Sequence, residues 1–545
     1  MNFQKIKHQT YLLSIFLFFL IHQIFYLIKG GNTYDELFLI YESGNIFNKI
    51  RLFFTDNNNP LLYDIGVNEY YGFLVILPIY ILANSTTINN LLDIFYINLE
   101  IQQQDEILYF NMHILLNIYV VVILYFIYRK LLNFYSKNTS LLVVIFITLF
   151  PSFNGQSLFN IKDIPYALQL FLGVIYLYSY LYNLYIGQNT NNKEILFTGI
   201  NIGLACLLRV NAYGFIGLVS FYFLILAIYK KSDLGEYLKM NLYVYFISLL
   251  VVIIGSPSSW KSPFEWFYDA LIHQFFYEWS GYTLTNGRFI EASNVSSTYL
   301  IEWFFYRSPI VYILGFIFYV LLFLKKETNN HFSRFALFFL LFVNLLFIFL
   351  KPNAYDGIRQ FLFLLPYISL IFVESINELF SKKSVRLIFF LASLLYVVYS
   401  QYTLGPYKYV YLNEFSDEIN ISEYCEKIDG CGDWPTDYYA FSGRELAKKI
   451  NNSNIQTLLS CKPPQAVNTY LKPNINVSRS VQELKDAKVT TFYTSSFHRP
   501  RPFNDSCRFD INNVIYDCRM IDKVVTKLRS KEIALSYISK CEVNY

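Results

Sequence analysis

The feature that most constrains this chain is a succession of long apolar runs over its first 401 residues. A helical crossing of a bilayer needs about 17 to 25 predominantly apolar residues. Only 48 of these 401 residues are charged, whereas soluble proteins carry roughly 25% charged residues. The sequence therefore predicts an α-helical polytopic membrane protein and excludes a soluble, fibrous or disordered chain. The eleven runs that we interpret as spans are 11–28, 107–128, 140–158, 164–186, 195–208, 212–229, 238–255, 308–324, 335–350, 358–378 and 385–401.

The distribution of basic residues predicts the orientation of these spans. A further apolar run, 70–82, is short and contains Pro78, so we expect it to lie at the interface or to dip into the bilayer without crossing. With the N-terminus cytoplasmic, fourteen basic residues then fall in short inner segments, as the positive-inside rule requires. Counting 70–82 as a span would put most of them outside. They are Lys5, Lys7, Arg129, Lys130, Lys137, Lys193, Lys230, Lys231, Lys325, Lys326, Arg334, Lys382, Lys383 and Arg386.

Residues 402–545 have the composition of a soluble domain, with 36 charged residues among 144. We therefore divide the chain into a membrane domain, 1–401, and an extracytoplasmic tail, 402–545. Six of the seven cysteines lie in this tail, which is typical of disulfides in an oxidising compartment, although six free thiols are the alternative. Their pairing stays open. The six are Cys425, Cys431, Cys461, Cys507, Cys518 and Cys541.

The pattern of the tail predicts a small α/β domain. Residues 442–450 have a helical pattern in which Ser442 is a candidate N-cap, because Glu445 follows three residues later as in a capping box. Short β-branched and aromatic runs follow this helix and are typical of strands. These runs are 455–460, 489–494, 513–516 and 533–538.

Acidic residues stand at the outer ends of two predicted spans. Asp35 and Glu36 follow the first span within a few residues, and Asp163 precedes Pro165 at the start of another. A carboxylate held at the membrane surface can accept a proton from an attacking hydroxyl, and its neighbour can orient the acceptor. The alternatives are an ordinary solvated pair for Asp35 and Glu36, and a helix N-cap for Asp163.

Basic residues stand on the same predicted face. Arg209 and Arg359 lie at outer helix ends, and Lys162 lies beside the acid of the preceding motif. A guanidinium fork matches phosphate oxygens, so these three residues are candidates for a donor phosphate site. The alternative for the arginines is snorkelling to lipid headgroups. We assign Asn211 and Asp356, which adjoin the two arginines in sequence, to shaping the substrate pocket.

The outer segment 256–307 adds aromatic residues that suit the membrane interface and can also stack on sugar rings. We assign Trp266 and His273 of this segment to shaping the substrate, although His273 can equally be a structural histidine. The sequence has no zinc-ligand spacing and no phosphate-cradling glycine loop. The site residues therefore include no expected metal ligand, and the need for a divalent cation stays open.

Five motifs together resemble the membrane-embedded GT-C glycosyltransferases, in particular the group of protein mannosyltransferases and aminoarabinose transferases (glycosyltransferase family 39-like). They are Asp35-Glu36, Phe159–Pro165, Tyr355–Phe361, Tyr409–Glu414 and Asp437–Glu445. The resemblance implies an outward-facing cavity and a polyprenyl-phosphate sugar donor. It implies that Asp35 is the catalytic base, that Glu36 helps to place the acceptor, and that Asp163 is the second acid of the site.

The resulting hypothesis is a glycosyltransferase that moves one sugar from a lipid-phosphate donor to a glycan, lipid or protein acceptor on the outer face. Lys162, Arg209 and Arg359 would neutralise the phosphate leaving group. The alternatives are an O-antigen polymerase or ligase and, from another class, a polytopic transporter. No nucleic acid partner is expected. The bilayer would be a bacterial inner membrane or, in a eukaryote, the endoplasmic reticulum membrane.

Overall fold

The structure is a computed structural model. It describes residues 3–55, 73–98, 103–188, 190–230, 234–260, 262–275, 281–416, 434–460, 463–478, 480–497, 510–511 and 514–543. Four tail cysteines of the disulfide hypothesis, Cys425, Cys431, Cys461 and Cys507, lie outside these residues.

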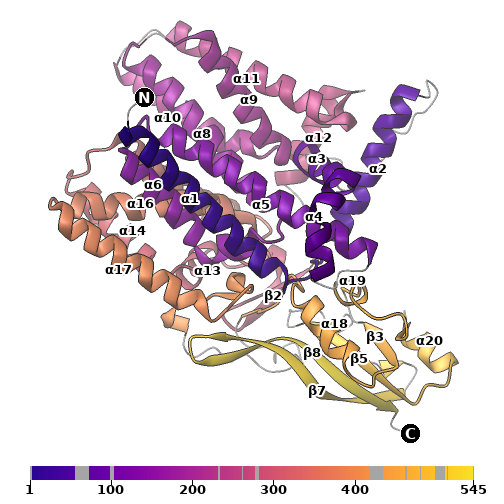
Figure 1. Cartoon of the computed structure of the whole chain (residues 1–545). Helices are drawn as coiled ribbons and strands as arrows, with labels where there is room; N and C mark the ends of the chain where they lie inside the picture. Colours follow the sequence, from indigo (N-terminus) through magenta and orange to yellow (C-terminus); the bar gives the residue numbers. More distant parts are fainter. Residues whose placement is uncertain are drawn as a thin grey trace.

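Helices form a bundle over the membrane part, and a sheet with short helices lies at one end of it (Figure 1). Each predicted span except 140–158 coincides with one helical segment. The bundle consists of α1 (Phe3–Leu27), α5 (Gln104–Leu131), α6 (Lys137–Leu149), α7 (Pro151–Gln156), α8 (Asp163–Tyr185), α9 (Asn192–Leu208), α10 (Ala212–Lys230), α11 (Leu234–Gly255), α14 (Ile310–Leu324), α15 (His331–Leu350), η5 (Arg359–Leu364), α16 (Leu365–Leu379) and α17 (Lys383–Tyr402).

Seven helical segments of the described residues are long and apolar enough to cross a bilayer: Gln104–Leu131, Asp163–Tyr185, Ala212–Lys230, Leu234–Gly255, His331–Leu350, Arg359–Leu379 and Lys383–Tyr402. Three shorter apolar helices add Tyr11–Leu27, Lys137–Leu149 and Ile310–Leu324. The predicted class, a polytopic helical membrane protein with a C-terminal α/β part, is confirmed. The count of eleven crossings and their orientation stay predictions.

The prediction of one continuous span over 140–158 is wrong. Helix α6 ends at Leu149, Phe150 is extended with φ −61° and ψ 122°, and α7 starts again at Pro151. The physical reason is the proline, because its ring disfavours the helical conformation of the residue before it. The break turns Gln156, at the end of α7, and Asn160 toward the start of α8.

The two long segments between predicted spans, 29–106 and 256–307, contain much regular structure. Segment 29–106 holds α2 (Glu36–Thr55), α3 (Phe73–Ala83) and α4 (Thr86–Asn98). Its apolar run falls on α3, which has 11 described residues and Pro78 inside it. Segment 256–307 holds η3 (Pro257–Ser259), α12 (Pro263–Phe275), the hairpin of β1 (Tyr282–Thr285) and β2 (Arg288–Glu291), η4 (Ala292–Asn294) and α13 (Tyr299–Arg307).

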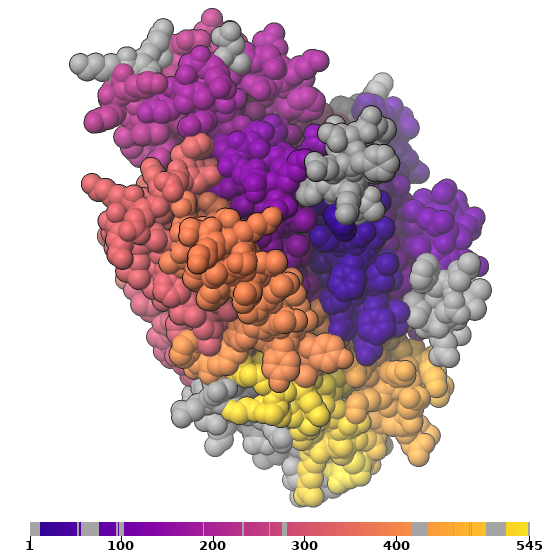
Figure 2. All heavy atoms as spheres, turned by 60° about the vertical axis from the view of Figure 1, so that its left-hand side comes forward, coloured from indigo at the N-terminus to yellow at the C-terminus, as the bar shows by residue number. Residues whose placement is uncertain are grey.

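The tail is an α/β unit built around a sheet of strand order β4-β3-β5-β8-β7-β6. Strand β3 pairs in parallel with β4 and β5, and the other pairs are antiparallel. The long β7–β8 hairpin crosses the lower end of the molecule (Figure 1), where the C-terminal residues form the yellow surface in Figure 2. The elements are η6 (Lys408–Val410), η7 (Glu414–Ser416), α18 (Gly443–Asn451), β3 (Thr457–Ser460), α19 (Gln465–Asn468), β4 (Asn476–Ser478), α20 (Val481–Asp486), β5 (Thr491–Phe497), β6 (Asp510–Ile511), β7 (Val514–Leu528) and β8 (Lys531–Val543).

Two tail predictions have different outcomes. The capping box is wrong: Ser442 stands at the N-cap of α18 but its hydroxyl makes no cap hydrogen bond. It donates instead to Asp437, at 2.5 Å, because this buried carboxylate is the stronger acceptor. Cys541 is disulfide-bonded and lies opposite Cys518 in the register of β7 and β8. At this position the disulfide hypothesis is confirmed.

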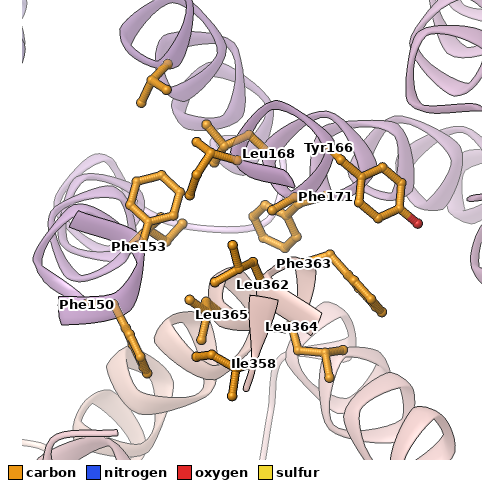
Figure 3. Close-up of a cluster of buried hydrophobic side chains, with 14 of the residues drawn as sticks. Phe150, Phe153, Tyr166, Leu168, Phe171, Ile358, Leu362, Phe363, Leu364 and Leu365 are labelled. Atoms are coloured by element: carbon orange, nitrogen blue, oxygen red, sulfur yellow. The ribbon is translucent and has the colours of Figure 1, made fainter. Parts of the chain in front are cut away.

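An apolar core fixes α8 against η5 (Figure 3). Leu168 and Phe171 of α8 face Leu362 of η5 and Leu365, the first residue of α16, and all four side chains are buried. Burial of each such side chain stabilises the fold by about 1.5–3 kcal/mol. This packing sets the position of the first residues of α8 and η5, which are charged.

Candidate active site

Arg359, the first residue of η5, binds three carboxylates that are far apart in the sequence. Its Nε donates to Asp163 Oδ2 at 2.8 Å, and its Nη1 donates to Asp356 Oδ2 at 3.2 Å. Its Nη2 pairs with Asp35. The side chain of Asp163 is only 2% exposed and that of Asp35 is 33% exposed. Asp35 is therefore the carboxylate that a substrate can reach.

Arg209 approaches the same cluster from the end of α9. Its Nη2 pairs with the other oxygen of Asp163, and its guanidinium lies 5.6 Å from the centre of the Tyr166 ring. The turn that carries Arg209 is held by Asn211, whose Oδ1 accepts from the Tyr166 hydroxyl at 2.9 Å. The Asn211 backbone N–H donates to Gln274 Oε1 of α12 at 3.1 Å. Asn211 therefore positions Arg209.

Asp163 is not the cap of α8, so the alternative interpretation of this residue is wrong. It is the first helical residue, and Lys162 holds the N-cap position without a side-chain cap. Asn160 satisfies the helix start, since its Oδ1 accepts from the backbone N–H of Asp163 at 2.9 Å. The Asn160 amide also donates to Asp163 Oδ2 and to Gln156 Oε1. The Asp163 carboxylate is thus left to bind the two guanidinium groups.

Lys162 and His273 lie next to these ion pairs. Burial, and then the nearby charge of Arg209, lowers the pKa of Lys162 to about 7. Burial and the charge of Lys162 also lower the pKa of His273. His273 therefore lies within electrostatic reach of Lys162, on α12. Trp266, one to two turns earlier on the same helix, is buried and packs into the core.

Asp356 belongs to a tight turn that orients Arg359. Asp356 and Gly357 both adopt left-handed conformations, with φ of 60° and 71°. The Tyr299 hydroxyl accepts from the Gly357 N–H at 3.0 Å, and a Cβ at Gly357 would lie 2.9 Å from the Trp303 ring. The glycine is required here because both its dihedral angle and this close approach disfavour a side chain.

Glu36 contacts different residues from Asp35. Its Oε1 pairs with His113 Nε2 of α5, and its Oε2 accepts from the Thr33 N–H at 2.6 Å. Glu36 is only 2% exposed. Its contacts fix the segment before α2 to α5 and so help to hold Asp35. The predicted role in placing the acceptor stays untested.

The tail also reaches the site, which the sequence analysis did not foresee. The Gly31 N–H donates to the Phe441 carbonyl at 2.9 Å, and the Tyr34 N–H donates to the Tyr439 carbonyl at 3.1 Å. The Arg359 guanidinium lies 5.7 Å from the centre of the Tyr439 ring. The motif Asp437–Glu445 was recognised in sequence, but no local signal indicated that it contacts Arg359.

The cluster is balanced in charge. It contains three carboxylates (Asp35, Asp163 and Asp356) and three basic groups (Lys162, Arg209 and Arg359). Such a site can bind an anion when a basic group exchanges its carboxylate partner for the ligand. The accessible carboxylate can accept a proton. Among the described residues, no group of three His, Cys, Asp or Glu is placed to hold a metal ion.

For this polytopic helical protein, the family comparison indicates the class of membrane-embedded glycosyltransferases. Residues 95–262 match the model for dolichyl-phosphate-mannose-protein mannosyltransferase. The resemblance predicted from sequence is thereby confirmed over this segment. The segment includes Lys162, Asp163 and Arg209, whereas Asp35 and Arg359 lie outside it.

Comparison with curated proteins finds no significant match. Several solved structures match at low identity. The apo oligosaccharyltransferase of Archaeoglobus fulgidus is 12% identical, with 89% of this chain and 69% of that chain covered and a TM-score of 0.48. The same organism's AglB in complex with an inhibitory peptide and a dolichol-phosphate has a TM-score of 0.46, at 12% identity and 91% and 70% coverage. ArnT from Cupriavidus metallidurans bound to undecaprenyl phosphate has a TM-score of 0.41, at 10% identity and 79% and 84% coverage.

Proposed function

We propose that this protein transfers one sugar from a polyprenyl-phosphate donor to a hydroxyl or amine acceptor on the outer face of the membrane. The observation that carries the proposal is the bridge made by Arg359 between the accessible Asp35 and the buried Asp163. In this proposal Asp35 is the base, and the guanidinium beside it binds the donor phosphate. The match to the mannosyltransferase family supports the same reaction class.

In the proposed reaction, the acceptor oxygen or nitrogen attacks the anomeric carbon from the face opposite the phosphate. The bond between this carbon and the phosphate oxygen breaks, and its electron pair leaves with the polyprenyl phosphate. Asp35 takes the acceptor proton, and the product has inverted configuration. Fixed positive groups stabilise the charge that develops on the leaving phosphate. Arg359, Arg209 and Lys162 have this role.

The binding of donor and the release of the base are coupled in this proposal. Asp35 is paired with Arg359 in the structure, so the guanidinium occupies one of its carboxylate oxygens. A donor phosphate that takes over the Nη2 group of Arg359 leaves Asp35 free to accept the proton. The second carboxylate, Asp163, keeps Arg359 in place during the exchange, because it binds Nε on the other side of the guanidinium.

The test compares Asp35→Asn with wild type, using radiolabelled polyprenyl-phosphate sugars and an envelope extract of the source cells as acceptor. Loss of a general base should lower transfer by about 10²–10⁴-fold. Undecaprenyl phosphate should still raise the melting temperature of the Asp35→Asn variant, as it should that of the wild-type protein. Glu302→Gln, which alters a carboxylate of the surface ion pair with Arg288, is the matched control and should transfer normally.

Normal transfer by Asp35→Asn at equal expression would remove Asp35 from the mechanism. The same assay separates the alternatives. A glycan polymerase or ligase would require a preassembled lipid-linked glycan, and a transporter would move label across vesicles without forming a new glycosidic bond.

A further inference from the structure

The tail loop Asp437–Arg444 is built to hold a fixed shape. The buried Asp437 carboxylate accepts hydrogen bonds from the Tyr409 hydroxyl at 2.5 Å and from the backbone N–H groups of Phe441 and Ser442. Burial raises the pKa of Asp437. Ala440, at the centre of the loop, has a φ of 61°, a left-handed conformation that strains a non-glycine residue. Strain of this kind persists only where the surroundings fix the backbone.

This loop contacts the segment that carries Asp35 along its backbone. The two backbone hydrogen bonds from Gly31 and Tyr34 join the segment to the loop. The contact is very close at Gly30, where an added Cβ would lie 1.9 Å from the Phe441 ring. The position of Asp35 therefore depends on the tail as well as on α1.

Tyr439 extends from the loop to both ends of the ion-pair cluster. Its ring faces the Arg359 guanidinium at 5.7 Å, within the range of a cation–π contact. Its hydroxyl donates to Gln156 Oε1 at 3.0 Å, and the same oxygen accepts from Asn160, which binds Asp163. Tyr439 is buried, so these contacts are not available to solvent or to a ligand.

We infer that Tyr439 is a positioning residue of the active site. The ring of this tail residue holds the Arg359 guanidinium between Asp35 and Asp163. This inference rests on the proposed function for its catalytic consequence. The ring lies against the guanidinium whose three nitrogen atoms bind three carboxylates, so it restricts the movement of this group. The soluble tail is thus a part of the catalytic centre, although no residue of the tail contacts the reacting atoms in this scheme.

The experiment compares Tyr439→Leu, which removes the ring, with Tyr439→Phe, which keeps it and removes only the hydroxyl. The turnover number is divided by the number of undecaprenyl-phosphate molecules bound per protein molecule. This correction removes the contribution of misfolded protein, which does not bind the lipid. Tyr439→Leu should lower this corrected turnover about tenfold or more, and Tyr439→Phe should stay within about threefold of wild type, because cation–π contacts depend on the ring. Wild-type turnover in Tyr439→Leu, or equal losses in both variants, would overturn the inference.

Two further variants perturb the same contact from the other side. Gly30→Ala should push Phe441 away and lower the corrected turnover in the same manner as Tyr439→Leu. Gly217→Ala is the matched control, because a Cβ there would meet nothing within 4 Å. Full turnover in Gly30→Ala would contradict the claim that the tail loop positions Asp35.

A double-mutant cycle separates failure of this inference from failure of the proposed function. The unfolding of Tyr439→Leu, Arg359→Gln and the double variant is measured in detergent without any substrate. The two substitutions should be non-additive, since residues in contact show coupling. Additive effects would refute the contact itself. The proposed function would be refuted if the wild-type protein neither bound undecaprenyl phosphate nor transferred sugar. The double-mutant cycle would still test the contact between Tyr439 and Arg359, because it needs no substrate.

Discussion

Asp163→Asn should destabilise the fold more than any other single loss of charge in the cluster. The side chain of Asp163 is 2% exposed, and those of its partners Arg209 and Arg359 are 15% and 10% exposed. Removing one partner of a buried ion pair costs about 3–5 kcal/mol, because the remaining charge stays in a medium of low dielectric constant. Here two guanidinium groups lose their common partner. An asparagine keeps the shape and one acceptor oxygen, so we expect the free energy of unfolding to fall by about 3 kcal/mol.

The assay is equilibrium unfolding in mixed micelles, followed by intrinsic fluorescence. Arg288→Met is the matched control, since it breaks an ion pair whose side chains are 46% and 21% exposed. Such an exposed pair contributes about 0–1 kcal/mol. Adding Arg209→Met to Asp163→Asn should recover part of the loss, because it removes one of the two uncompensated charges.

A loss below about 1 kcal/mol in Asp163→Asn, equal to that of the control, would refute this reasoning. It would mean that water or another anion compensates the guanidinium groups as well as Asp163 does. Asp163→Asn should also lower transfer activity, because Asp163 no longer fixes Arg359 on the side away from Asp35.

Two further predictions concern Lys162 and Gly357. Burial lowers the pKa of Lys162 to about 7, so its positive charge is lost as the pH rises above this value. The affinity for a phosphodiester donor, whose own charge does not change in this range, should fall by up to about tenfold per pH unit there. Lys162→Arg should abolish this dependence, and a flat wild-type profile would contradict it. Gly357→Ala should cost about 1–2 kcal/mol for the left-handed backbone plus the contact with Trp303, and should lower transfer. Gly187→Ala, with φ +75° and open space around it, should show the backbone cost alone, and equal effects would show that the Trp303 contact is unimportant.

The membrane part and the ion-pair residues could be predicted from sequence because both leave local signals. Apolar runs of sufficient length have few alternatives to helices in a bilayer. A charge at a helix end near the bilayer is usually paired or functional, which is why the sequence alone indicates Asp163, Arg209 and Arg359. The structure brings these residues together with Asp35, as the hypothesis required.

The contacts that complete the site could not be predicted, because they depend on tertiary packing. His113, which pairs with Glu36, lies 77 positions away, and nothing near either residue indicates the other. The Ser442 pattern was misinterpreted for a related reason. A capping motif describes only local competition, whereas the buried Asp437 is held in reach by Tyr409 from outside the helix. Sequence periodicity carries no information about such partners.

The order of the chain has a consequence for when the site can become competent. Asp35 precedes the tail loop in the chain by about 400 positions, but its segment is joined to the tail through the hydrogen bonds of Gly31 and Tyr34 with Phe441 and Tyr439. Two such bonds contribute only about 0.5–1.5 kcal/mol each, so they cannot hold the tail by themselves. Their alignment must come from the packing of the loop against the bundle, including the close approach at Gly30. The geometry around Asp35 and the docking of the tail therefore form one cooperative unit, in which the charged groups of the helices carry the proposed chemistry and the tail supplies the alignment.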